Sequence, residues 1–167
     1  MPPLMLGDVA AYGPTDGGVL LLGQAPNKWM HDHNRPDHAL WRRDLAELAR
    51  LTMPEYYRLF TRANLLQEYP GKAGKGDAFP MRLARPAAKA LRPHLSAFKE
   101  VVFLGKMVAE AFSHWGDWFE WRGDAPRLAM SPHPSRISTW WNIPGHGKRA
   151  GQFWLDLAAV ARGRVGG

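Results

Sequence analysis

Two short, continuous apolar runs restrict what this chain can fold into. Val19–Leu22 and Val101–Leu104 are each followed directly by a glycine. Apolar runs of this length without polar alternation are typical of strands buried on both faces, as in parallel sheets. Stretches with helical spacing lie between such runs, for example at 39–51, where leucines recur at intervals of three to five residues. This alternation predicts an α/β fold.

The architecture we expect is a three-layer α/β/α sandwich around a central, mostly parallel, four-stranded sheet. The apolar pattern places strands at 19–22, 62–66, 101–104 and 127–131. It places helices at 39–51, 54–60, 82–98, 106–115 and 149–162. A length of 167 residues suits one domain. We therefore expect residues 1–167 to form a single domain, with irregular tails at 1–16 and 163–167.

The composition narrows the classes of function. The chain has no cysteine, which excludes disulfides, a thiolate nucleophile and cysteine-ligated zinc or iron–sulfur clusters. It carries 22 Lys and Arg against 15 Asp and Glu, and the formal net charge of +7 favours a polyanionic partner. No apolar run near the start is long enough for a signal-peptide core or a membrane span, so we expect a cytoplasmic protein that binds no membrane.

Polar residues follow three of the predicted strands. In parallel sheets the carboxyl ends of the strands form the ligand crevice, so these three loops are the candidate site. The loops are Gly23-Gln24-Ala25-Pro26-Asn27, the segment that begins at Asn64, and Ser131-Pro132-His133-Pro134-Ser135-Arg136. Taken together, in this order and at about this spacing over most of the chain, these motifs resemble those of the uracil-DNA glycosylase superfamily.

The resemblance implies a role for each loop. Gly23, Ala25 and Pro26 would line the pocket for an extruded base. Asn64 would read the Watson–Crick edge of that base, because an amide offers both donors and an acceptor. His133 would donate a hydrogen bond to the negative charge that develops on the departing base.

The same resemblance implies contacts to DNA. Ser135 would hold a phosphate, and Arg136 or Ile137 would enter the gap that a flipped base leaves in the stack. Lys72 and Lys75 lie in a Gly-rich loop, which we interpret either as a basic loop that touches the DNA backbone or as a solvated linker.

The chain departs from the family at Ala25, where the best-studied uracil enzymes have an Asp that orients or activates the attacking water. Gln24, Asn27, Asp32 and His133 are the remaining candidates for that task.

Two further departures concern the base. Asn27 stands where those enzymes have a bulky Tyr that excludes thymine, so a larger base would fit. The family's stacking Phe has no clear counterpart. Trp29, Met30 and Trp41 are candidates for that surface, although Trp41 suits core packing better.

The function we expect is that of a monofunctional DNA glycosylase. It would flip a base out of single- or double-stranded DNA and hydrolyse its N-glycosidic bond, acting as a monomer without a cofactor or a metal. The substrate would be a modified pyrimidine, as in defence against viral DNA, or uracil, as in repair. Two alternatives stay open: an inactive DNA- or nucleotide-binding module of the same fold, and a metal-dependent phosphoesterase using His31, Asp32 and His33.

Overall fold

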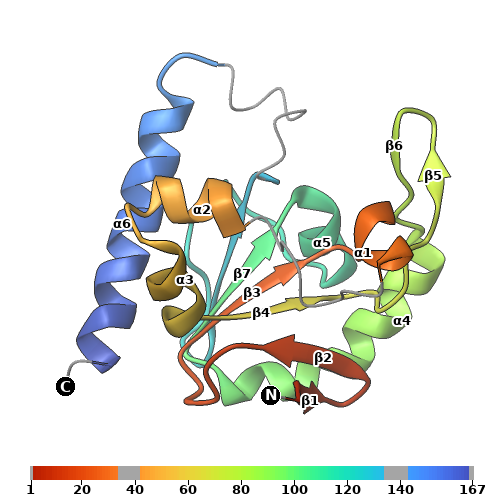
Figure 1. Cartoon of the computed structure of the whole chain (residues 1–167), viewed down its shortest axis with the longest axis horizontal. Coiled ribbons are helices and arrows are strands. Elements are labelled where there is room, and N and C mark those ends of the chain that lie inside the picture. The colour runs from red at the N-terminus through yellow and green to blue at the C-terminus, as the bar shows by residue number, and fades with distance from the viewer. Residues whose placement is uncertain (1, 34–41, 134–142, 166–167) are drawn as a thin grey trace.

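The computed structural model describes residues 2–33, 42–133 and 143–165. These residues form a mixed α/β fold around one large, mostly parallel sheet (Figure 1). The strand order is β1-β2-β4-β3-β7-β8. The strands are β1 (Leu4–Leu6), β2 (Val9–Tyr12), β3 (Val19–Gly23), β4 (Phe60–Asn64), β7 (Glu100–Leu104) and β8 (Arg127–Ser131).

The parallel part of the sheet consists of β4, β3, β7 and β8. The run Val19–Leu22 lies in β3, between β4 and β7, and is buried throughout, as its sequence predicts. The run Val101–Leu104 falls in β7, and the strand expected at 127–131 is confirmed as β8.

The expected number of four strands was wrong, because residues 4–12 form a β-hairpin instead of an irregular tail. Its strand β2 pairs antiparallel with β4, with Ala11 opposite Ala63, and β1 continues the sheet to six strands. β1 lies at the edge of the sheet, and two of its three residues are exposed. An edge strand this short leaves little hydrophobic pattern in the sequence.

Helices lie on both faces of the sheet. On one face, Leu20, Leu22 and Phe103 share a hydrophobic core with α4 (Met81–Leu91), α5 (Lys106–Ala111) and a 3-10 helix at 92–97. On the other face, Val19, Leu21 and Val102 pack with α2 (Arg42–Leu48), α3 (Met53–Leu59) and α6 (His146–Val165). Alternate residues of each buried strand therefore serve opposite cores.

Local signals explain where several of these helices begin and end. Thr52 caps α3 and forms a capping box with Glu55, and Pro54 lies in the first turn. The expected helix at 82–98 becomes 3-10 at 92–97, a segment that contains Pro93, which has no N–H to continue an α-helix. Two elements were not expected: α1 (Lys28–Asp32), and a small hairpin of β5 (Lys72–Ala73) and β6 (Gly76–Asp77).

The C-terminal helix extends further than its pattern predicts, to Val165, so residues 163–165 are not an irregular tail. Arg164 explains the extension. Its guanidinium forms two hydrogen bonds with the carboxylate of Glu100, which is 2% exposed and also contacts Arg127 at 3.3 Å. A separate ion pair joins Arg162 to Glu55 of α3 at 2.7 Å. In the part of the chain that the structure describes, no helix is long and apolar enough to cross a membrane.

Candidate functional site

The loops after β3 and β4 are joined by backbone hydrogen bonds. Gly23 lies opposite Asn64 at the end of the parallel ladder. The Leu65 N–H donates to the Gly23 carbonyl and the Leu66 N–H donates to the Gln24 carbonyl, both at 2.9 Å. Two of the three predicted loops therefore lie side by side at the carboxyl edge of the sheet.

Asn64 is buried, with 6% of its surface exposed. Its side-chain Oδ1 has no hydrogen-bond partner among the residues that the structure describes. A small cavity adjoins it, lined also by Pro26, Leu66, Gln67, Ala10 and Tyr12. A buried acceptor without a partner is rare and costly in a folded protein. The Oδ1 of Asn64 is therefore available to a polar group that enters this cavity, whose volume of about 10 Å³ suits one water molecule.

Hydrogen bonds of the Gln67 side chain connect the N-terminal hairpin to the loop after β4. Its side-chain amide donates to the Asn64 carbonyl at 2.7 Å and accepts the Ala10 N–H at 2.9 Å. The hairpin thus supplies Ala10 and Tyr12 to the cavity wall. Sequence analysis missed this wall because it did not predict the hairpin.

Gly105 brings the first and third loops together. A Cβ atom built on Gly105 would lie 3.5 Å from Gln24 Nε2 and 3.6 Å from His133 Cβ. The Gly105 N–H donates to the Ser131 carbonyl at 2.8 Å, and this hydrogen bond joins the carboxyl ends of β7 and β8. Its backbone has φ 108° and ψ 152°, a conformation that is essentially restricted to glycine. Sequence analysis recognised Gly105 only as the end of a strand.

His133 is half-buried beside Gly105. Burial lowers the pKa of its imidazole to about 4, because the charged form loses solvation. The ring is therefore neutral at neutral pH. A neutral imidazole carries one N–H and can donate a hydrogen bond without bringing a positive charge into the site.

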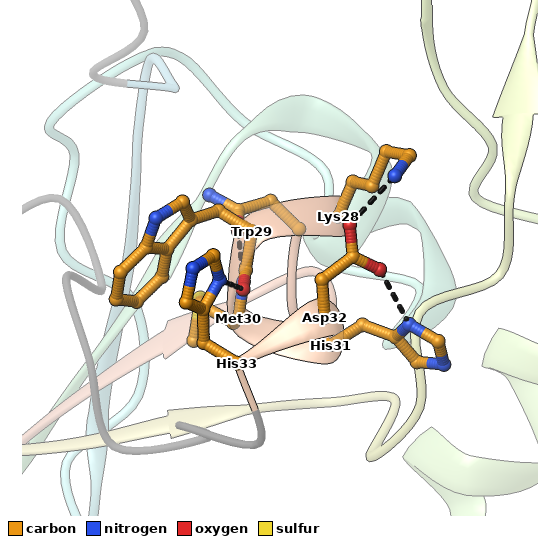
Figure 2. Close-up of polar contacts among 7 residues, drawn as sticks. Lys28, Trp29, Met30, His31, Asp32 and His33 are labelled. Atoms are coloured by element: carbon orange, nitrogen blue, oxygen red, sulfur yellow. Dashed lines mark hydrogen bonds and ion pairs between the residues drawn. The ribbon is translucent and has the colours of Figure 1, made fainter.

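Helix α1 follows the first loop and shows two different sides (Figure 2). Asn27 caps it, with its side-chain oxygen accepting the Met30 N–H at 2.9 Å. On one side, the rings of Trp29 and His33 stack with centroids 4.1 Å apart, and His33 Nδ1 donates to the Trp29 carbonyl at 2.8 Å. Trp29 is 44% exposed, so a large aromatic surface lies near the strand ends.

The other side of α1 carries the acidic candidate. Asp32 is exposed and accepts a hydrogen bond from Lys28 Nζ at 2.6 Å, with His31 Nδ1 at 3.2 Å (Figure 2). The hydrogen bonds from Lys28 and His31 lower the pKa of Asp32, so it is ionised at neutral pH. The side chain of His33 is turned to Trp29 instead. Among the described residues, no group of three or more His, Asp and Glu side chains gathers to hold a metal ion.

The predicted DNA contacts are only partly described. Lys72 lies in β5 and Lys75 in the turn that follows it, and both are exposed. This hairpin extends from the sheet near α1 and α4 (Figure 1). Tyr69, just before it, lies with its ring centroid 5.9 Å from that of His31. Ser135, Arg136 and Ile137 lie outside the described residues.

The fold and the site define a class: a mixed α/β protein with a polar cluster at the carboxyl edge of a mostly parallel sheet. A comparison with models of protein families finds none that matches this chain, and a comparison with curated proteins finds no match either.

Proposed function

We propose that this protein is a DNA glycosylase that flips one base out of DNA and hydrolyses its N-glycosidic bond. The observation that carries the proposal is that Gln24 and His133 both lie close to Gly105, next to the loop that bears Asn64. The closeness of these three strand-end loops supports the proposal, because base excision needs base-binding and charge-stabilising groups in one site.

In the proposed reaction, Asn64 binds the edge of the extruded base with its Oδ1, which has no hydrogen-bond partner among the described residues, and with its amide N–H groups. The oxygen of a water molecule bonds to C1′ of the sugar while the C1′–N bond breaks. The departing base takes the bonding electron pair and later the proton that the attacking water releases, so that the products are a C1′ hydroxyl and a neutral base. His133 stabilises the resulting charge by donating its N–H, a task for which a neutral ring is suited.

Gln24 is our first candidate to position the water, because its amide and the side chain of His133 both lie close to Gly105. Asn27 is a weaker candidate, since its oxygen already caps α1. Asp32 is paired with Lys28, so in the proposal it acts through its negative charge on the cationic sugar and not as the base.

The rest of the proposal concerns DNA. Trp29 offers the exposed aromatic surface for stacking, and Lys72 and Lys75 contact phosphates. Ser135, and Arg136 or Ile137 as the wedge, keep the roles that the family resemblance implies. Uracil and a larger modified pyrimidine both remain candidate substrates.

A second candidate is an inactive DNA-binding module of the same fold. The observation that favours it is the lack of a carboxylate at Ala25, together with the engagement of Asp32 by Lys28. The metal-dependent alternative has less support, because His33 is turned to the Trp29 carbonyl and does not join the pair of His31 and Asp32.

The test is a gel assay with purified protein and EDTA on oligonucleotides that contain uracil, hypoxanthine, hydroxymethylcytosine or glucosylated cytosine. Alkali then cleaves any abasic site. We expect cleavage of one substrate, lost in His133→Ala and Asn64→Ala and retained in His94→Ala, which removes an exposed histidine of the 3-10 helix. DNA binding with every substrate intact would favour the binding module.

A further inference from the structure

A groove of about 700 Å³ runs along α6, away from the candidate site. Its second wall carries Phe119 and Trp121, in a segment that pairs with the edge strand β8. Arg122 in this segment exchanges two backbone hydrogen bonds with Leu128, at 2.8 and 2.7 Å. Among the described residues, none from the strand-end motifs lines the groove.

The α6 wall has the spacing of a helix-packing surface. Lys148, Gln152, Asp156 and Val160 recur every four residues, with Arg149, Phe153 and Leu157 between them. This stripe extends from 148 to 160, which is about 18 Å at 1.5 Å per residue. Rows at this spacing are the ridges against which a second helix packs.

The floor of the groove is apolar and firmly held. Phe153 and Leu157 belong to the core behind it, and the rings of Phe119 and Trp121 lie 4.9 and 5.4 Å from the ring of Phe153. Val160 is 38% exposed at one end. Phe153 and Leu157 are 8% and 2% exposed, so the apolar surface that faces solvent is that of Val160 and of the half-buried rings of Phe119 and Trp121. Covering this surface with a partner gains free energy.

Cations surround this floor. Arg149 lies over Phe119 at 5.7 Å and donates to the Trp118 carbonyl at 2.7 Å, while Arg127 lies over Trp121 at 4.5 Å. Lys148 adds a third positive charge. Among the described lining residues, Asp156 is the one carboxylate, and it accepts a hydrogen bond from Gln152 at 2.8 Å.

The charge at Arg127 is not neutralised by its acidic partner. Glu100, which it contacts, also binds Arg164 with both oxygens, so one carboxylate serves two guanidinium groups. These contacts hold the groove's arginines in place before any partner arrives, which lowers the entropy that binding would lose.

We propose that this groove binds an amphipathic α-helix of a partner protein, with its apolar face on Val160 and the half-buried rings of Phe119 and Trp121 and with Asp or Glu on its flanks. The length of the stripe on α6, the apolar floor of the groove and the cations around it all fit such a helix. DNA fits less well, because bases stacking on Phe119 or Trp121 would have to displace existing ring contacts. A second copy of this chain, with its net charge of +7, would bring like charge to a cationic rim.

The experiment uses the full chain and three fluorescein-labelled 18-residue peptides, followed by fluorescence anisotropy. One peptide has Leu at helical spacing with Glu on its flanks. A second has the same composition with the Leu residues distributed around the helix, and a third has Lys in place of Glu. We expect the first to bind about tenfold tighter than either of the others, with affinity falling as salt is raised.

Two pairs of variants locate the binding. Val160→Glu and Lys148→Glu should each weaken binding of the acidic peptide about tenfold, because each adds negative charge to the groove. Leu83→Glu and Lys89→Glu, at exposed positions of α4, make the same changes elsewhere and should leave binding unchanged. Thermal melting of all four variants checks that they are folded.

Three results would overturn the proposal. The first is equal or absent binding of the three peptides. The second is displacement of the acidic peptide by a single-stranded oligonucleotide whose own binding is weakened by Val160→Glu, which would make the groove a nucleic-acid site. The third is a dimer of the wild-type protein that Val160→Glu dissociates, which would make a second copy the occupant. None of these three results depends on base excision.

Discussion

Gln24 and His133 both lie close to Gly105, a residue without a side chain. The position that a Cβ of Gly105 would take lies 3.5 Å from the Gln24 amide nitrogen and 3.6 Å from His133 Cβ. Three strand ends, those of β3, β7 and β8, are joined at this point. The candidate site therefore requires glycine at position 105.

Substituting Gly105 with Ala should therefore destabilise the protein. At φ 108° and ψ 152° an L-residue is strained, and we expect a loss of about 1–3 kcal/mol in the free energy of unfolding, measured by urea denaturation. Gly151→Ala is the matched control. It lies within α6 with no atom near the added methyl group, so it should stabilise by about 0.5–1 kcal/mol. Equal effects at both positions would contradict the assignment.

Asn64→Leu should separate stability from activity. The substitution removes a buried acceptor that has no partner, so the free energy of unfolding should stay within about 1 kcal/mol of the wild type or rise. Under the proposed function, base excision should fall by about 100-fold or more. Circular dichroism melting and the gel assay measure the two effects. A large loss of stability would show that the amide serves the fold.

His133 should make the protein less stable in mild acid. Its pKa of about 4 in the folded state lies below that of an unfolded histidine, near 6.5, so the unfolded chain binds the proton first. The stability associated with a neutral His133 is fully present above pH 6.5 and is lost as the pH falls toward 4. This loss lowers the free energy of unfolding by an amount on the order of 2–3 kcal/mol. Urea unfolding at several pH values should show a flatter dependence for His133→Gln than for the wild type.

Glu100→Gln should destabilise the attachment of α6. Glu100 is almost fully buried between Arg127 and Arg164, and its neutralisation leaves two guanidinium groups without their anion. We expect a loss of about 3–5 kcal/mol in the free energy of unfolding. Glu110→Gln, which breaks the exposed pair with Arg85, is the control and should cost less than about 1 kcal/mol. Similar losses would contradict a structural role for the buried pair.

The double variant Lys72→Glu, Lys75→Glu tests the basic hairpin. If both lysines contact phosphates, DNA binding should weaken, and the slope of log K against log salt should become shallower by about 2. Titration of a labelled duplex at four salt concentrations measures this slope. Lys89→Glu on α4 should leave the slope unchanged. A slope that does not move would show that the hairpin lies away from the DNA.

Much of the fold follows from local pattern. The uninterrupted apolar runs at 19–22 and 101–104 can be buried on both faces only in the middle of a sheet, and they lie there as β3 and β7. Thr52 and Glu55 specify the start of α3 through contacts within one turn. These features depend on neighbours in the chain, so the sequence alone reveals them.

Other parts depend on residues that are distant in sequence. The hairpin at 4–12 is short and lies at the sheet edge, and β4 is what completes its pairing. The length of α6 depends on Arg164 reaching Glu100. α1 has only five residues, too few for a periodic signal, although Asn27 is a typical cap.

For the candidate site, the sequence by itself determined the residue types and their place at strand ends: the first loop, Asn64 and His133. Tertiary structure alone decided which of them meet. It aligned Gly23 with Asn64, left the Asn64 Oδ1 without a hydrogen-bond partner within the described part of the chain, and placed Gln24 and His133 both close to Gly105. It also engaged Asp32 with Lys28. The physical reason is that strand order and register place side chains in three dimensions, and the sheet sets both through long-range pairing that no local pattern encodes.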